Sequence, residues 1–299
     1  MSSQETPFVV QSLIGKYNLS FYMECLNSLT SLCHEDINLL LHTDGTLNKK
    51  DMESVLNHFG TQSVRFHDTE KAKQVTLDHL EGHPNCQKLR QKSLWGIEFF
   101  DPLFSNPSEP ISYYVDADIL FLRPFSGLFD SSVVKGGAVF LRDTQWDAYS
   151  LRPWQLFGPG IRPSIVEGIT TALVCWDKRA IDWDYLEWFI SQTKFHCIPE
   201  WVLPTAQAGL ARRCKAKIVA PVQLTNLYPN ATIEKETFGV HLLGSYRNEW
   251  RSKVKKYARE IPKEESPTQT CFEPCHPRGV IAYTGKQAKR WVNTRLNRW

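Results

Sequence analysis

The chain has 299 residues, and 42% of them are hydrophobic, which is enough to bury a large core and excludes a disordered or fibrous protein. Its 35 basic and 32 acidic residues give a formal net charge of +3, so we expect no nucleic-acid partner. The sequence contains no apolar run of about 18 residues, so we expect no transmembrane helix, and its first residues lack the pattern of a signal peptide. With eight scattered cysteines that we expect to be reduced, the sequence predicts a cytoplasmic protein.

Apolar runs typical of strands alternate with segments that have helical spacing. In chain order the expected elements are a strand from Phe8 toward Ile14, a helix over Ser20–Leu32, strands at Ile37–Leu41 and Val64–Phe66 around a helix over Asp51–Phe59, a helix over Gln91–Phe104, strands at Ile111–Val115, Ala138–Leu141 and Thr171–Cys175, a helix over Pro204–Arg213, and strands at Lys217–Ala220 and Phe238–His241. This order predicts a single α/β domain over residues 1–265, with a mixed, mainly parallel central sheet flanked by helices.

Residues 266–299 are expected to form a basic C-terminal extension that packs on the domain or trails from it. From His276 to Trp299 there are six Lys or Arg residues and no Asp or Glu. One interpretation is a solvated end packed by its tryptophans. The other is a peripheral contact with an anionic membrane surface or with a partner.

Two carboxylates follow the apolar strand Ile111–Val115, in the sequence Asp116-Ala-Asp118. Side chains at i and i+2 on extended backbone point to the same side. Removing two like charges from water costs several kcal/mol each by order of magnitude, and a divalent cation between them would remove that cost. The alternative is a pair of turn aspartates at the end of a strand, because Asp-x-Asp alone is a weak signal. Carboxylate oxygens suit Mg²⁺ or Mn²⁺, and ligands of open α/β sheets gather at the carboxyl ends of strands.

A second motif, His241-Leu-Leu-Gly244-Ser-Tyr-Arg247, stands near the end of the chain. His241 offers a neutral nitrogen to the same metal ion. Gly244 would allow backbone to approach a ligand closely, and Arg247 has the forked donor geometry that suits phosphate.

The two motifs together resemble those of nucleotide-sugar glycosyltransferases with the GT-A fold. Within that group the chain is most similar to the retaining family of glycogenin and the bacterial lipopolysaccharide glucosyl- and galactosyltransferases. The resemblance implies that Asp116, Asp118 and His241 bind Mn²⁺, or Mg²⁺, and that the metal holds the diphosphate of a UDP-sugar. It also implies that Arg247 contacts the donor phosphates.

The family also has a donor-binding lysine near the helix before Asp-x-Asp. Lys92 corresponds to it best, with Arg90 and Lys88 as alternatives. In GT-A folds the end of the second strand approaches the nucleotide base, which assigns a donor contact to Asp44. Glu200 and Gln207, in Pro199–Gln207, are candidates for contacts to the sugar or the acceptor.

The resemblance implies an enzyme, a hexosyltransferase that moves a hexose from a UDP-sugar to a hydroxyl group of a glycan, lipid or protein acceptor, with retention. If the enzyme inverts configuration instead, it needs a carboxylate base, and Glu200 is the first candidate. Thr170-Thr171-Ala172 stands where the family has Asn-Ser/Ala-Gly. That departure favours a first alternative, a degenerate protein that binds a sugar nucleotide or glycan, and a sugar-nucleotide hydrolase is the second.

One further motif is similar to a motif of a different enzyme class. His42-Thr-Asp44-Gly45-Thr46 has the form of the nucleophile loop of haloacid-dehalogenase-like phosphatases. Its nucleophilic aspartate would fall on His42, which cannot form an aspartyl phosphate. We therefore interpret this segment as the exit of a strand into a turn.

Overall fold

In the computed structural model, which describes residues 7–144, 147–156, 163–229, 231–244, 246–260 and 266–296, a large sheet runs through the molecule. Within these residues it has eight strands, in the order β13 (Phe272–Pro274), β9 (Lys215–Val219), β7 (Gly137–Arg142), β8 (Ile169–Asp177), β4 (Ile111–Val115), β1 (Phe8–Ile14), β2 (Ile37–Thr43) and β3 (Val64–Phe66). The pairs β4–β1, β1–β2, β2–β3 and β9–β7 are parallel, and the other pairs are antiparallel. This mixed, mainly parallel sheet confirms the predicted fold class.

Strand β7 shows why the sheet is covered on both faces. Ala138 and Phe140 belong to one hydrophobic cluster, together with side chains of the helices on that face, whereas Val139 and Leu141 belong to a second cluster on the other face. Successive residues of a strand point to opposite faces, so a continuous apolar run is what a strand buried on both sides requires.

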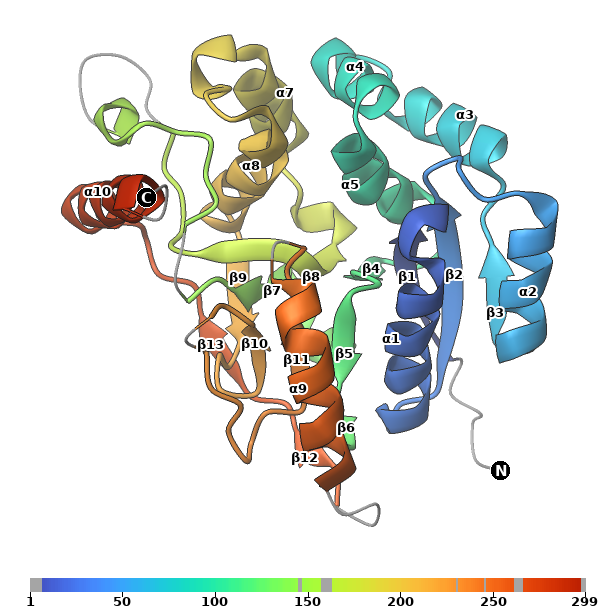
Figure 1. Cartoon of the computed structure of the whole chain (residues 1–299). Helices are drawn as coiled ribbons and strands as arrows, with labels where there is room; N and C mark the ends of the chain where they lie inside the picture. The colour runs from blue at the N-terminus through green and yellow to red at the C-terminus, as the bar shows by residue number, and fades with distance from the viewer. Residues whose placement is uncertain are drawn as a thin grey trace.

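The helices lie on both sides of this sheet (Figure 1). In Figure 1, α5, α7 and α8 gather along its upper side, while α1 lies beside β1 and β2. The helices are α1 (Leu19–Leu32), α2 (Lys49–Phe59), α3 (Thr69–His79), α4 (Pro84–Lys92), α5 (Leu94–Phe104), α6 (Ser131–Val134), α7 (Trp183–Ser191), α8 (Val202–Ala211), α9 (Arg247–Glu260) and α10 (Val280–Leu296). None of the described helices is both long and apolar enough to cross a bilayer.

The helix expected over Gln91–Phe104 is instead two helices, α4 and α5. Ser93 between them has extended backbone, with φ −138° and ψ 134°. At Gly96 an added Cβ would lie 2.5 Å from the carbonyl oxygen of Leu89 and 2.6 Å from Cα of Arg90. The glycine therefore lets α5 fold back closely on α4, which a single continuous helix would not do.

Two short sheets extend the lower half of the molecule. One has the order β10 (Leu224–Asn226), β11 (Gly239–His241) and β5 (Ile119–Phe121), and the other pairs β12 (Thr268–Gln269) with β6 (Phe125–Ser126). Strand β11 runs parallel to β10 and antiparallel to β5. This pairing connects the segment after β4 with a segment more than a hundred residues later.

The described part of the C-terminal extension packs on the domain. Strand β13 is the edge strand of the central sheet, and the Arg278 side chain donates hydrogen bonds to Asp147 and Glu167. In α10 the Tyr283 hydroxyl donates to the carbonyl of Leu151, at 2.6 Å. The boundary expected at residue 265 and the last three residues lie outside the described residues.

Candidate metal and donor site

The Asp-x-Asp motif forms the turn that follows β4. The backbone amide of Asp116 donates to the carbonyl of Ala172 in β8, at 2.7 Å, and the amide of Ile119 donates to the carbonyl of Asp116, at 3.1 Å. The carbonyl of Asp118 accepts from the amide of Leu242, at 3.0 Å. Backbone bonds to two other segments thus hold both aspartates at the carboxyl end of a buried strand.

His241 is brought to the aspartates by the pairing of β11 with β5, in which His241 lies opposite Ile119. Asp116, Asp118 and His241 each offer a ligand atom, and these atoms lie within 4.8 Å of one another. The sequence analysis predicted this set from residues far apart in the chain. The structure brings the three together.

Asn226, the last residue of β10, fixes the imidazole of His241. The Nδ1 atom lies 2.8 Å from the amide oxygen of Asn226. A carbonyl oxygen can only accept, so Nδ1 carries the hydrogen and Nε2 is the nitrogen that faces Asp118, 3.2 Å from its Oδ1. The neutral ring therefore presents a lone pair toward the carboxylates, as metal-binding histidines with a second hydrogen-bond partner do.

Arg247, the first residue of α9, completes the group. Its Nη2 donates to Oδ2 of Asp118 at 2.6 Å, and its guanidinium lies 4.9 Å from the centre of the Phe21 ring. The ion pair and the ring contact hold the guanidinium beside the carboxylates. A forked donor in this place could bind phosphate oxygens.

Burial and mutual charge shift the protonation of these groups. Burial lowers the pKa of His241, but the charge of Asp118, its hydrogen bond and the charge of Asp116 together outweigh burial and raise the pKa above its ordinary value. Burial alone would raise the pKa of Asp118, yet His241 and Arg247 hold it below its ordinary value. Burial, then Glu98 and Asp118, raise the pKa of Asp116 well above its ordinary value. Metal binding requires deprotonated ligands, so a cation at this group would oppose the raised pKa values of His241 and Asp116.

The group also fits a divalent cation on two further grounds. Oδ1 of Asp118 is buried, and apart from the His241 Nε2 atom 3.2 Å away it has no hydrogen-bond partner among the described residues. An unpaired buried carboxylate oxygen is costly unless something else coordinates it. Two carboxylates and one imidazole are, moreover, a donor set that suits Mn²⁺ and Mg²⁺.

The other donor-site candidates differ in burial and in the contacts that their side chains make. Arg90 forms a buried ion pair with Asp101, so its guanidinium is committed to the fold, and we do not keep it as a donor contact. Lys92 is exposed at the end of α4, and Gly244 is exposed, with open space where a Cβ would stand. Asp44 follows β2 and accepts hydrogen bonds from the backbone amide and hydroxyl of Thr46. None of these positions shows a contact with the Asp-Asp-His group within the described residues.

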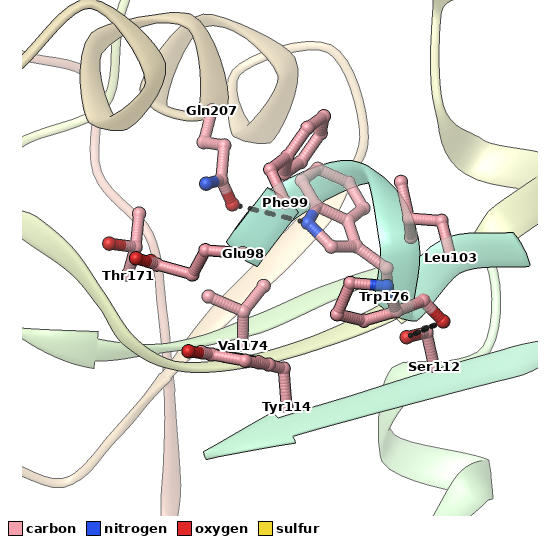
Figure 2. A pocket seen from close by; sticks show the side chains of 10 residues that line it. Glu98, Phe99, Leu103, Ser112, Tyr114, Thr171, Val174, Trp176 and Gln207 are labelled. Carbon is pink, nitrogen blue, oxygen red and sulfur yellow. Dashed lines mark hydrogen bonds between the residues drawn. The ribbon is translucent and has the colours of Figure 1, made fainter. Parts of the chain in front are cut away.

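The two sugar or acceptor candidates lie in different surroundings. Glu200 is exposed in the short helical turn Pro199–Trp201. Gln207 is buried in α8, where its Oε1 accepts a hydrogen bond from Trp176 Nε1 at 3.3 Å, and it lines a small cavity beside the site (Figure 2).

Sequence reasoning missed three polar residues that surround the Asp-Asp-His group. Asn226 orients His241, the Tyr114 hydroxyl donates to Oδ1 of Asp116 at 2.8 Å, and Glu98 lines the cavity in Figure 2. A carboxylate within the apolar segment of α5 was a usable signal for Glu98, because an unpaired buried charge is rare. Strand β10 is too short to show a pattern that would have identified Asn226.

No family model and no curated protein matches the sequence. Among solved structures, mouse xyloside xylosyltransferase 1 in its apo form matches with a TM-score of 0.53 and 12% identity, over 89% of this chain and 97% of that one. The bifunctional glycosyltransferase WbbM in its apo form matches with a TM-score of 0.51 and 8% identity, over 86% of this chain and 52% of the WbbM chain, about half of that protein's length. At such identities the likeness is one of fold, and the fold is GT-A, as the resemblance implied.

Proposed function

We propose that this protein is a metal-dependent glycosyltransferase that moves a hexose from a UDP-sugar to an acceptor hydroxyl group with retention. The observation that carries the proposal is the convergence of Asp116, Asp118 and His241 at the carboxyl end of β4 in a GT-A fold. These three residues would hold Mn²⁺ or Mg²⁺. When bound, the ion would supply Lewis-acid stabilisation of the diphosphate leaving group.

The chain's own residues would orient and neutralise the donor. Arg247 lies against Asp118, so its guanidinium would add positive charge where negative charge grows on the departing diphosphate. Asn226 would keep His241 in the tautomer that presents Nε2. Lys92, Gly244 and Asp44 remain proposed donor contacts.

Retention or inversion depends on the acceptor side. A retaining front-face route needs no dedicated base, whereas an inverting route needs a carboxylate beside the acceptor hydroxyl, for which Glu200 is our candidate. The acceptor itself is proposed to be a glycan, lipid or protein. The anomeric configuration of the first product, read by NMR, decides between the two routes.

The C-terminal helix α10 is proposed to contact an anionic membrane from the cytoplasmic side. Its exposed residues include Ile281 at 90%, Trp291 at 58% and Val292 at 43% exposure, and Lys289 is exposed on the same helix. Apolar side chains beside cations are what an interfacial helix needs. Co-sedimentation with phosphatidylserine vesicles tests this, and Ile281→Asp should abolish it.

Calorimetric titration of UDP, with and without Mn²⁺, tests the donor site. We expect tight binding to wild type only with Mn²⁺, and loss of that binding in Asp116→Asn and Asp118→Asn. Asp184→Asn, at a fully exposed carboxylate, is the matched control and should bind as wild type does. Metal-independent UDP binding, or wild-type affinity in Asp118→Asn, would overturn the site.

A turnover assay then separates three activities. UDP release that requires an acceptor supports a transferase. Release of UDP and free sugar without any acceptor indicates a hydrolase. Binding without turnover across acceptor classes indicates the degenerate binding protein that Thr170–Ala172 had suggested.

A further inference from the structure

A small cavity lies between α5, α8 and the strands β4 and β8, next to the Asp-x-Asp turn (Figure 2). Its volume of about 20 Å³ is the space of one water molecule or of one hydroxyl group of a ligand. Figure 2 shows the carboxyl group of Glu98 and the hydroxyls of Thr171 and Tyr114 at one end of it, with Gln207 above them. Glu98, Thr171 and Tyr114 thus form one polar end, while the Ser112 hydroxyl at the other end donates to the carbonyl of Pro102.

The Glu98 end of the cavity adjoins the metal group. The Tyr114 hydroxyl donates to Oδ1 of Asp116, at 2.8 Å, and Thr171 directly precedes Ala172, whose carbonyl accepts from the Asp116 amide. The charge of Glu98 also contributes to the raised pKa of Asp116. A group in this end of the cavity would therefore belong to a ligand that also reaches the metal group.

Two polar side chains of the cavity have capacity left for a ligand. The Glu98 carboxyl group is hydrogen-bonded by the Thr171 hydroxyl, and a carboxyl group can make several hydrogen bonds. Gln207 is 2% exposed and its Oε1 is occupied by Trp176 Nε1, but its Nε2 finds no acceptor in the part of the chain that the structure describes. A ligand acceptor in the cavity would give this amide donor a partner.

The cavity also limits which ligand group it can hold. Among the residues that the structure describes, no Lys or Arg lines it, and its remaining walls include Phe99, Val174 and Trp176. A carboxylate would be buried there beside Glu98 without a cation, and an acetamido group is larger than the space. A single neutral hydroxyl group satisfies both limits.

We propose that this cavity receives one hydroxyl group of the sugar being transferred, held by the carboxyl group of Glu98 and the amide nitrogen of Gln207. The inference rests on the proposed function and deepens it, because it makes Glu98 a residue that determines which sugar is transferred. Burial, opposed by Thr171 and aided by Asp118, raises the pKa of Glu98 to about 8. A carboxyl group accepts hydrogen bonds from a hydroxyl group and, when it carries a proton, also donates one.

The test compares UDP with UDP-glucose and UDP-galactose by calorimetry in the presence of Mn²⁺. Glu98→Ala should weaken the affinity for the better UDP-hexose by about tenfold to a hundredfold and leave the affinity for UDP within about twofold. Glu98→Gln, which keeps one acceptor and one donor, should recover most of the loss. Glu70→Ala, at an exposed position of α3, is the control for a lost carboxylate.

Deoxy donors identify the hydroxyl group. UDP-glucose lacking the hydroxyl at C2, C3, C4 or C6 is titrated against wild type and Glu98→Ala. One of the four deoxy donors should bind wild type more weakly than UDP-glucose does. The same donor and UDP-glucose should bind Glu98→Ala equally well, because the variant has already lost the contact that the missing hydroxyl group makes. Equal weakening of UDP and UDP-hexose, or additive losses for all four donors, overturns the inference. If wild type binds UDP but no UDP-hexose, the proposed function fails first.

Discussion

The hydrogen bond from His241 to Asn226 gives the sharpest test of the site. Asn226→Ala removes the only acceptor that the described residues offer to Nδ1, and leaves this nitrogen buried in a side chain that is 7% exposed. The ring is then free to rotate or to move its hydrogen to Nε2, the atom that faces Asp118. Either change removes the lone pair from the metal group.

Outer partners of metal-binding histidines typically contribute tenfold to a hundredfold in metal affinity, which is about 1.4 to 2.7 kcal/mol. We expect a loss of that size in the calorimetric affinity for Mn²⁺ with UDP. Asn226→Asp keeps an acceptor oxygen and should recover most of it. Thr225→Ser is the matched control, because Thr225 precedes Asn226 in β10 and its side chain therefore points to the opposite face of the strand. Unchanged Mn²⁺ affinity in Asn226→Ala would refute the role assigned to this bond.

Three further predictions concern the fold around the site. Arg90→Ala leaves the buried carboxylate of Asp101 without its ion pair and should lower the free energy of unfolding in urea by about 3 to 5 kcal/mol. The affinity for UDP with Mn²⁺ should not change. A loss of that affinity without a loss of stability would assign Arg90 to the donor site after all. Burial lowers the pKa of His42 to about 3 in the folded protein, whereas its pKa in the unfolded chain is near 6.5. Between these two values only the unfolded state binds the proton, so the free energy of unfolding decreases as the pH falls from 6.5 toward 3. Between pH 7 and pH 5 the free energy of unfolding of His42→Gln should therefore fall by about 2 kcal/mol less than that of wild type. Parallel curves of unfolding free energy against pH for the two proteins would contradict this. Arg278→Met leaves Asp147 buried without its guanidinium, so protease digestion should cut the C-terminal segment faster than in wild type; equal rates would contradict this.

The sequence was most informative where polar residues follow apolar strands. Asp116 and Asp118 stood out because two like charges after a buried strand need a counter-charge, and His241 because it ends another such strand. Their meeting, however, depends on the pairing of β11 with β5. Local periodicity contains no information about which distant strands pair, so the two motifs were connected by the ligand chemistry of His241 and by the family resemblance.

Residues that act through other side chains were not predictable in the same way. Arg90 was proposed as an alternative to Lys92 for a donor-binding lysine of the family that the chain resembles, but Asp101 in α5 pairs with it in the core. Whether a cation faces solvent, ligand or a buried carboxylate depends on the angle between α4 and α5. That angle depends on Gly96, whose role follows only from the close contact with Leu89.

The strand pairing of β11 with β5 also orders events during synthesis. Asp118 leaves the ribosome 123 residues (241 − 118) before His241 does, a delay of about 6 to 25 s at 5 to 20 residues per second. A nascent chain in that interval carries both aspartates and the apolar β5 edge, but lacks the imidazole and the strand that covers the edge. Binding of a metal ion by all three ligands therefore requires that β11 has already paired with β5.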